Sequence, residues 1–241
     1  MTASDEQLRL LNETVLYHLD AIYRDILPEA SLPQLSHEII DIMRLNVTYH
    51  DAVPHKNNWD QHDMVLITYG NSVQREGEAP LKTLHCFLDQ EIRGYINGVH
   101  ILPFFPYCSD DGFAVMDYYA VNRALGDWND IESIARDYRL MADLVINHGS
   151  SSGEWFKNFI KGEGPGHDYF FTTLANTPVS QVVRPRTSPL LRETETHDGI
   201  TYVWCTFSHT QVDFDFRNPA VLKEFINIVR FYLDKGIRLF R

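Results

Sequence analysis

The stretch Met141-Ala142-Asp143-Leu144-Val145-Ile146-Asn147-His148 decides the fold class of this chain. From Met141 to Ile146 it is an apolar run broken only by Asp143, which is typical of a strand buried on both faces of a parallel sheet. Alternation predicts that Asp143, Val145 and Asn147 point to one side and that His148 stands at the strand's end. Because parallel α/β proteins build their sites at the carboxyl ends of strands, these polar residues are site candidates.

Similar apolar runs occur on both sides of this stretch, at residues 64–69, 99–102 and 237–240. Helical patterns stand between the runs, at residues 81–92 and 128–138 and from Asn218-Pro219 to Lys235-Gly236. Asp127 and Asn218 are suitable N-caps for the second and third of these helices. Strands that alternate with helices in this way predict a parallel sheet of βα units, and therefore an α/β fold.

Two helices are predicted before the first strand. Apolar residues recur every three or four positions over 8–26, Ser4 and Gln7 can form a capping box, and Pro28 follows the end of the pattern. A second helix is expected at 36–45. Both are expected to pack outside the main fold.

Residues 149–215 are far more than a βα connection normally needs. Their mixture of Gly, Pro, Ser and Thr with aromatic residues predicts short strands in an inserted subdomain over a strand's carboxyl end. We therefore expect a helical segment at 1–50, the first part of the catalytic core at 51–148, the insert at 149–215 and a return to the core at 216–241.

The composition argues against several classes of function. A net charge of −12 disfavours a nucleic-acid partner, because counterion release from phosphates needs clustered cations. No apolar run could cross a bilayer and the N-terminus lacks a secretory signal, so we expect a cytoplasmic protein without membrane association. Cys86, Cys108 and Cys205 have neither disulfide nor zinc spacing. We expect no metal and no cofactor, and the oligomeric state is left open.

A second polar cluster follows the second strand, at residues 102–118. The Asp110 carboxylate could accept hydrogen bonds from two sugar hydroxyls, and the Phe113 ring offers an apolar face to a pyranose. Spacing alone equally allows an Asx turn and a core phenylalanine. His148 could likewise donate to a sugar hydroxyl or hold a loop, and Arg241 could orient a neighbouring carboxylate or be an exposed charge.

In this order and on these strands, the clusters resemble those of glycoside hydrolase family 13, the α-amylase family. Residues 143–148 match its Asp-x-x-x-Asn-His strand, and residues 98–128 match the block around its second strand. The resemblance covers most of the chain from Asp63 onward and implies the N-terminal half of a (β/α)8 TIM barrel with a small inserted subdomain after the third strand. Strings similar to those of the sucrose phosphorylase subfamily, which includes glucosylglycerate and glucosylglycerol phosphorylases, are Asp110-Asp111-Gly112-Phe113, Arg184-Pro185-Arg186, Phe207 and Gln211-Val212-Asp213-Phe214-Asp215.

The resemblance implies roles for individual residues. Asp110 and His148 would bind hydroxyls of one glucosyl ring, and Phe113 would stack beneath it. Arg241 would be the arginine of the family's Arg-x-Asp motif, so the nucleophilic aspartate, the acid/base glutamate and the third carboxylate would all follow residue 241. We therefore expect no catalytic carboxylate within this chain.

The implied reaction is retaining cleavage of an α-glucoside through a β-glucosyl-enzyme intermediate. In a phosphorylase, inorganic phosphate replaces water as acceptor and gives α-glucose 1-phosphate, which requires a cation on the acceptor side. We expect Arg186 there, because a guanidinium matches the geometry of phosphate, with Phe207 and Gln211 as further acceptor-side candidates. Alternatively, Arg184 and Arg186 pair with acidic residues nearby.

Two other functions stay open. The protein could be a retaining α-glucosidase or transglucosidase with the same barrel, although the Arg184-Pro185-Arg186 string speaks against it. The chain could also be a catalytically inactive fragment, since four strands cannot close an eight-stranded ring and leave open sheet edges. In that case the isolated chain is expected to associate and to show no turnover.

Overall fold

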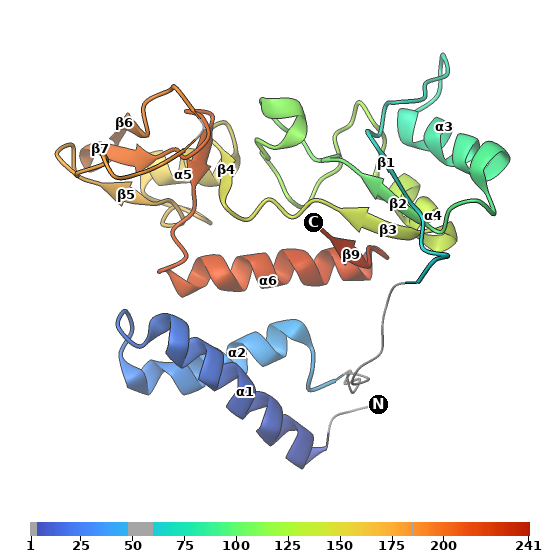
Figure 1. The fold of residues 1–241 in the computed structure, drawn as a ribbon. Coiled ribbons are helices and arrows are strands. Elements are labelled where there is room, and N and C mark those ends of the chain that lie inside the picture. Colours follow the sequence, from blue (N-terminus) through green and yellow to red (C-terminus); the bar gives the residue numbers. More distant parts are fainter. Residues whose placement is uncertain (1–3, 48–59, 185) are drawn as a thin grey trace.

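The computed structural model describes residues 4–47, 60–184 and 186–241. Its centre is a four-stranded sheet in the order β1-β2-β3-β9, and all neighbouring strands are parallel (Figure 1). The strands are β1 (Val65–Thr68), β2 (Gly98–Ile101), β3 (Arg139–Ala142) and β9 (Leu239–Phe240). Parallel strands that follow one another in chain order are the arrangement of a (β/α)8 barrel.

The register places β2 at the centre of the core. Gly98 of β2 faces Val65 of β1 and Arg139 of β3, and the pairing continues residue by residue. Every residue of β2 is buried. The outer strand β1 differs, because Ile67 is 63% exposed and only β2 pairs with β1 in the described part of the chain. The prediction that each strand is buried on both faces is therefore wrong for β1.

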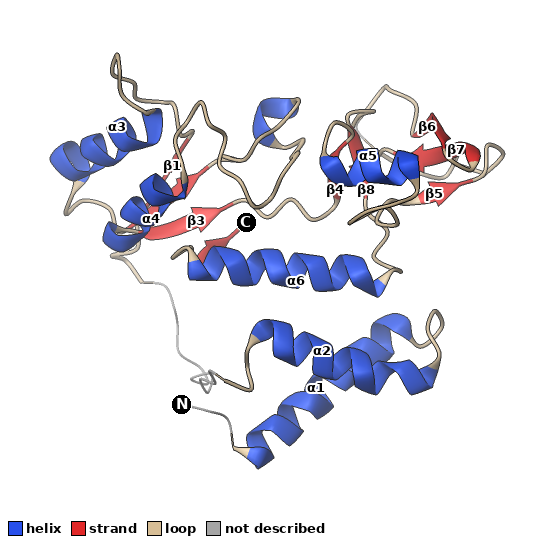
Figure 2. Cartoon of the chain, turned by 180° about the vertical axis from the view of Figure 1, so that it is seen from behind, coloured by secondary structure: helices blue, strands red, loops and turns tan. Residues whose placement is uncertain are grey.

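Three helices beside this sheet contribute to the hydrophobic core that contains it (Figure 2). They are α3 (Pro80–Phe87), which continues as a π-helical turn over Leu88–Ile92, α4 (Trp128–Asp137) and α6 (Pro219–Asp234). Leu84 of α3, Ile134 of α4 and Tyr232 of α6 are fully buried beside Val99 and Leu140 of the strands. Burial of one such side chain contributes about 1.5–3 kcal/mol, so these contacts hold the helices on the sheet.

The third strand ends earlier than predicted. β3 ends at Ala142, although Leu144 N still donates to Arg241 O over 2.9 Å. Farther along, the carbonyls of Val145 and His148 accept from the Tyr118 hydroxyl over 2.9 and 3.0 Å, so the backbone there is held by a side chain and not by a strand. The predicted alternation is wrong for the same reason, because Asp143 is buried whereas Asn147 is exposed.

Between β3 and α6 the chain forms two small antiparallel sheets and a helix. In the first sheet β4 (His148–Ser150) pairs with β8 (Gln211–Asp213). The second contains β5 (Thr172–Thr173), β7 (Gly199–Trp204) and β6 (Leu191–Thr196), and the helix α5 (Glu154–Lys161) lies beside both sheets (Figure 1). Short strands of the predicted kind are present here, while the limits of an inserted subdomain at 149–215 stay a prediction.

The N-terminal segment contains two helices, α1 (Asp5–Tyr23) and α2 (Leu32–Met43), with a 3-10 turn at Glu29–Ser31 between them. The predicted Ser4–Gln7 capping box is present at the start of α1. α2 begins before the predicted 36–45, because it follows directly on the 3-10 turn. In the described residues, no helix combines the length and the apolar character needed to cross a membrane.

Both N-terminal helices lie on the far side of α6 from the sheet (Figure 1). Leu19 of α1 and Leu35 of α2 join a second core with Leu222 and Ile226 of α6. The helices therefore pack outside the sheet, on its helical layer. The predicted boundary between residues 50 and 51 lies outside the described residues.

Candidate active site

Residues from separate parts of the chain meet beyond the carboxyl ends of the parallel strands. Gln211 Nε2 lies 2.8 Å from Asp110 Oδ2 and 3.1 Å from His148 Nε2. His148 Nε2 also lies 3.0 Å from Phe113 O. The guanidinium carbon of Arg241 lies 5.8 Å from the centre of the Phe113 ring. The structure thus brings these candidate residues into one cluster, and their roles in binding stay predictions.

Three consecutive positive φ angles turn the backbone sharply at Asp110. They are 58° at Asp110, 48° at Asp111 and 106° at Gly112, within the 3-10 segment Asp110–Gly112. Left-handed conformations at two successive non-glycine residues are unfavourable, and such strain is concentrated at functional sites. A Cβ on Gly112 would lie 2.7 Å from Pro103 Cβ, which only glycine avoids. The turn leaves the Asp110 side chain exposed and directed at Gln211.

Gln211 is the centre of the cluster and is only 2% exposed. Its Oε1 accepts a hydrogen bond from Ser208 Oγ over 2.8 Å, which leaves its amide nitrogen to donate to Asp110. Ser208 Oγ also bonds to Thr210 Oγ1 over 2.8 Å, and Thr210 Oγ1 bonds to Ser109 Oγ over 2.7 Å. The Asp110 carboxylate fixes the direction of the amide, because it only accepts hydrogen bonds and so requires the amide nitrogen, which leaves the amide oxygen to face Ser208.

His148 is buried in the cluster, with 5% of its surface exposed. Burial lowers the pKa of its imidazole below the ordinary 6.5, although the Phe113 carbonyl and the Asp213 and Asp110 carboxylates act in the opposite direction. With the proton on Nε2, this nitrogen donates to Phe113 O and makes no hydrogen bond with the Gln211 amide nitrogen, which is also a donor. Nδ1 then carries the lone pair, and it has no partner among the described residues. The ring also packs against Phe207, with centroids 4.9 Å apart. A buried imidazole of this kind can exchange hydrogen bonds with an uncharged hydroxyl.

Asp143 connects the ends of three parallel strands. It is 3% exposed and follows β3 directly. Arg241 Nη1 donates to its Oδ1 over 3.0 Å, and His100 Nε2, from β2, lies 2.9 Å from its Oδ2. Arg241 therefore contacts a neighbouring carboxylate, and which of its two predicted interpretations applies stays a prediction. Sequence analysis missed His100, whose only signal is a polar residue within an apolar run.

The two arginines of the Arg184-Pro185-Arg186 string have different contacts. Arg184 donates to the main-chain carbonyls of Thr206 and Ser188 and therefore holds the loop together. The guanidinium carbon of Arg186 lies 5.6 Å from the centre of the Phe207 ring, and the Arg186 side chain is exposed. Because Phe207 contacts His148, Arg186 stands at the edge of the cluster. Pro185 lies outside the described residues.

Asp213 is a second buried carboxylate behind the cluster, with 8% of its surface exposed. Burial raises its pKa, and hydrogen bonds from the main-chain N–H and the hydroxyl of Thr206 oppose this shift. It faces His148 across the β4–β8 pair. A buried carboxylate needs such donors, so Asp213 fixes Thr206 and with it the position of the next residue, Phe207.

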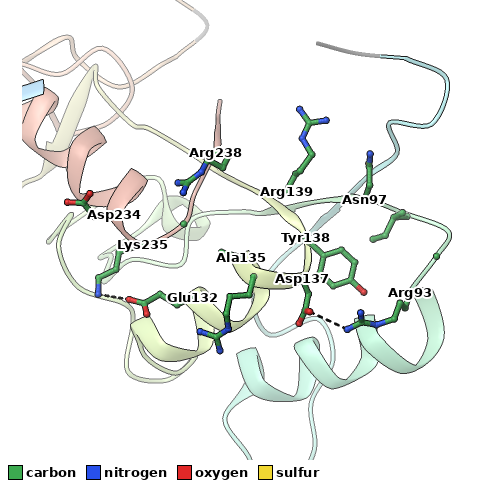
Figure 3. Close-up of a pocket in the computed structure, with 14 residues that line it drawn as sticks. Arg93, Asn97, Glu132, Ala135, Asp137, Tyr138, Arg139, Asp234, Lys235 and Arg238 are labelled. Atoms are coloured by element: carbon green, nitrogen blue, oxygen red, sulfur yellow. Dashed lines mark hydrogen bonds and ion pairs between the residues drawn. The ribbon is translucent and has the colours of Figure 1, made fainter. Parts of the chain in front are cut away.

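A cavity of about 670 Å³ lies at the other end of the sheet (Figure 3). Asn97, Arg139 and Arg238 line it from the amino ends of the strands, and Lys235 lines it from the carboxyl end of α6. Sites in parallel sheets lie at the carboxyl ends, whereas cations at helix carboxyl ends balance the helix dipole. We therefore assign these cations to stability. Across the described ranges, no group of three or more His, Cys, Asp or Glu side chains could hold a metal ion.

Comparisons with known proteins agree with this geometry. The family described as "Alpha amylase, catalytic domain" matches residues 94–241. The glucosylglycerate phosphorylase of Spirochaeta thermophila is 50% identical over 182 residues, which are 76% of this chain and 31% of that protein. The glucosylglycerate phosphorylase of Allomeiothermus silvanus is 42% identical over 231 residues, which are 96% of this chain and 40% of that protein. This chain thus spans less than half the length of these curated relatives.

A solved structure shows the same fold. The sucrose 6F-phosphate phosphorylase from Thermoanaerobacter thermosaccharolyticum is 26% identical, and the match covers 75% of this chain and 39% of that chain with a TM-score of 0.67. The predicted α/β fold, as part of a (β/α)8 barrel, is confirmed by this likeness and by the parallel sheet. The family match and the sequence relatives show that the chain belongs to the α-amylase family, glycoside hydrolase family 13, and to its sucrose phosphorylase-like branch.

Proposed function

We propose that the full-length protein is a retaining phosphorylase of an α-glucoside of the sucrose or glucosylglycerate type, and that it forms α-glucose 1-phosphate. The observation that carries the proposal is the contact between Gln211 and Asp110 beside His148, at the carboxyl ends of parallel strands. The relatives, which are glucosylglycerate phosphorylases and a sucrose 6F-phosphate phosphorylase, support it.

The cluster has the groups that hold one glucosyl ring. Asp110 uses one oxygen to accept the bond from Gln211, so its other oxygen can accept from sugar hydroxyls. The imidazole of His148 lies beside this carboxylate, and the half-buried Phe113 ring offers an apolar face. A few fixed polar groups next to an aromatic surface are typical of small-molecule sites. The nucleophile and the acid/base residue would come from the segment that follows residue 241 in the family pattern.

The acceptor side is proposed to lie at Phe207 and Arg186. Arg186 presents a guanidinium over the Phe207 ring, and a guanidinium can form two parallel hydrogen bonds with phosphate oxygens. Arg186 is the candidate for phosphate because its guanidinium lies over Phe207 at the cluster, whereas Arg184 donates to the carbonyls of Thr206 and Ser188. The insert at 149–215 would form this side of the site. We also propose a cytoplasmic location, which agrees with three cysteines that are free thiols.

The proposal is tested by incubating the full-length protein with sucrose, glucosylglycerate or glucosylglycerol, with and without inorganic phosphate. The expected result is α-glucose 1-phosphate that forms only with phosphate and from one preferred donor. Sugar release at the same rate without phosphate would instead establish a glucosidase or transglucosidase. Absence of turnover with every donor would favour the alternative that the protein is catalytically inactive. An Asp110→Asn variant serves as the control for turnover at this cluster.

A further inference from the structure

His100 is a buried polar residue whose place the proposed reaction leaves unexplained. Its side chain is 3% exposed, in the middle of a strand whose neighbours Val99 and Ile101 are fully buried apolar residues. Its Nε2 lies 2.9 Å from Oδ2 of Asp143, whose side chain is 4% exposed. Burying such a pair costs desolvation free energy, and an apolar pair is often equally stable. Stability alone therefore does not explain the His100–Asp143 pair, and the other contact of Asp143 bears on its role.

The other carboxylate oxygen of Asp143 holds Arg241. The main chain of Arg241 is fixed in the parallel ladder, because its N–H donates to Ala142 O over 3.1 Å and its carbonyl accepts from Leu144 N over 2.9 Å. The ladder does not fix the long side chain, which is 59% exposed. An arginine side chain has about 2 kcal/mol of rotamer entropy, so a rigid partner is needed to give it one direction. The 3.0 Å contact between Arg241 Nη1 and Asp143 Oδ1 supplies that partner.

We propose that His100 is a positioning residue that fixes the direction of Arg241 through Asp143. The bond from His100 to Oδ2 sets the plane of the carboxylate, and that plane decides where Oδ1 meets the guanidinium. Arg241 then stands 5.8 Å from the centre of the Phe113 ring, inside the cluster. The expected loss of activity without His100 rests on the proposed function. The expected displacement of the Arg241 side chain does not.

The first experiment compares crystal structures of the full-length protein with His100→Leu and His100→Gln. Leucine removes the donor at similar volume, whereas the amide nitrogen of glutamine can reach the place of Nε2. The expected result is that the Arg241 guanidinium leaves Asp143 Oδ1 in His100→Leu and stays there in His100→Gln. An unchanged Arg241–Asp143 contact in His100→Leu would overturn the proposal. This experiment needs no turnover, so it decides the inference even where the proposed function fails.

The second experiment is a double-mutant cycle with His100→Leu and Arg241→Ala in the full-length protein. His100→Leu is expected to lower kcat about 10- to 100-fold, the loss typical of a misplaced group near the reacting atoms, with a smaller effect on KM. In the Arg241→Ala background the same change should lower kcat less than about twofold, because residues that act through one another are not additive. Equal losses in both backgrounds would overturn the proposal, and so would a failure of His100→Gln to restore kcat.

The chain offers a matched control at His85. His85 Nε2 lies 2.7 Å from Asp137 Oδ2, a histidine–aspartate contact between α3 and α4 at the amino end of the sheet. His85→Leu is expected to lower the melting temperature without changing kcat for the folded protein. An equal loss of kcat in His85→Leu and His100→Leu would mean that breaking any histidine–aspartate pair lowers kcat by destabilising the protein. That result would overturn the positioning role of His100.

Discussion

Gln211 and Asp110 are 101 residues apart in the sequence, yet Gln211 Nε2 donates a hydrogen bond to Asp110 Oδ2 over 2.8 Å. The bond joins the loop after β2 to strand β8, and Gln211 also contacts His148 of β4. The candidate binding residues therefore come both from the loop after β2 and from the segment between β3 and α6. A defect in that segment should disturb Asp110 although the two are remote in sequence.

Gln211→Ala is expected to weaken the binding of α-glucose 1-phosphate to the full-length protein about tenfold or more. A hydrogen bond to a charged group is worth about 1.5–3 kcal/mol, and its loss frees the Asp110 side chain. Isothermal titration calorimetry measures the dissociation constant. Gln181→Ala, at an exposed glutamine of the same segment, is the control and should leave the constant unchanged. Equal affinity in Gln211→Ala and the natural protein would contradict the role of this bond.

Local features of the fold could be predicted from the sequence because they depend on neighbours in the chain. The Asp127 side chain accepts from Asn129 N and Asp130 N at the start of α4, and the Asn218 side chain accepts from Ala220 N at the start of α6. Caps of this kind are decided within four residues. The strands were also predictable, because a run of apolar residues is long enough to mark one buried strand.

Features that depend on distant contacts could not be predicted. Beyond Leu144 the backbone that follows β3 is held by the Tyr118 hydroxyl, which bonds to the carbonyls of Val145 and His148 from another part of the chain. The partnership of His100 with Asp143 depends on the register of β2 with β3, which no local pattern reveals. For the candidate site, the resemblance to a family supplied residues that spacing alone left undecided.

Burial of His148 predicts a pH dependence of stability. Its pKa in the folded state is below 6.5, so the unfolded chain binds a proton that the folded state does not accept as pH falls through 6.5. Stability is therefore complete above this value and decreases as pH falls from it toward the lowered pKa. Urea unfolding of the full-length protein at pH 7.5 and 5.5 should show a smaller decrease in His148→Gln than in the natural protein. An equal decrease in both proteins would show that His148 is not responsible.

Gly112→Ala is expected to destabilise the protein by more than about 2 kcal/mol, because a methyl group there meets Pro103 and the φ angle is unfavourable for alanine. Gly77→Ala separates the two effects. Gly77 has a φ of 77° and no atom within 4 Å of an added Cβ, so it suffers only the backbone strain, of about 1 kcal/mol. Thermal unfolding measures both variants. Similar losses in the two variants would mean that contact with Pro103 is unimportant.

The isolated 241-residue chain is expected to associate through strand β1. β1 pairs with only one strand in the described part of the chain, and Ile67 on it is 63% exposed. Exposed apolar edge strands pair with other chains, and a charge on the edge prevents this. Ile67→Lys should shift the chain toward monomer in light scattering after size-exclusion chromatography. Ile200→Lys should not, because Ile200 is 67% exposed but lies on β7, in a different sheet from β1. A monomeric natural chain would contradict the prediction.

Arg186 and Arg184 are two positions apart, but their substitution should change different properties, namely the KM for phosphate and the melting temperature. Arg186→Ala is expected to raise KM for phosphate about tenfold or more and to leave KM for the glucosyl donor nearly unchanged, because a charge-assisted bond to phosphate is lost. Arg184→Ala is expected to lower the melting temperature, since Arg184 holds the carbonyls of Thr206 and Ser188. Steady-state kinetics at varied phosphate distinguish the two variants. If Arg186→Ala kept the natural KM for phosphate while Arg184→Ala raised it, the phosphate contact would belong to Arg184, and the loop would have to rearrange to free its guanidinium.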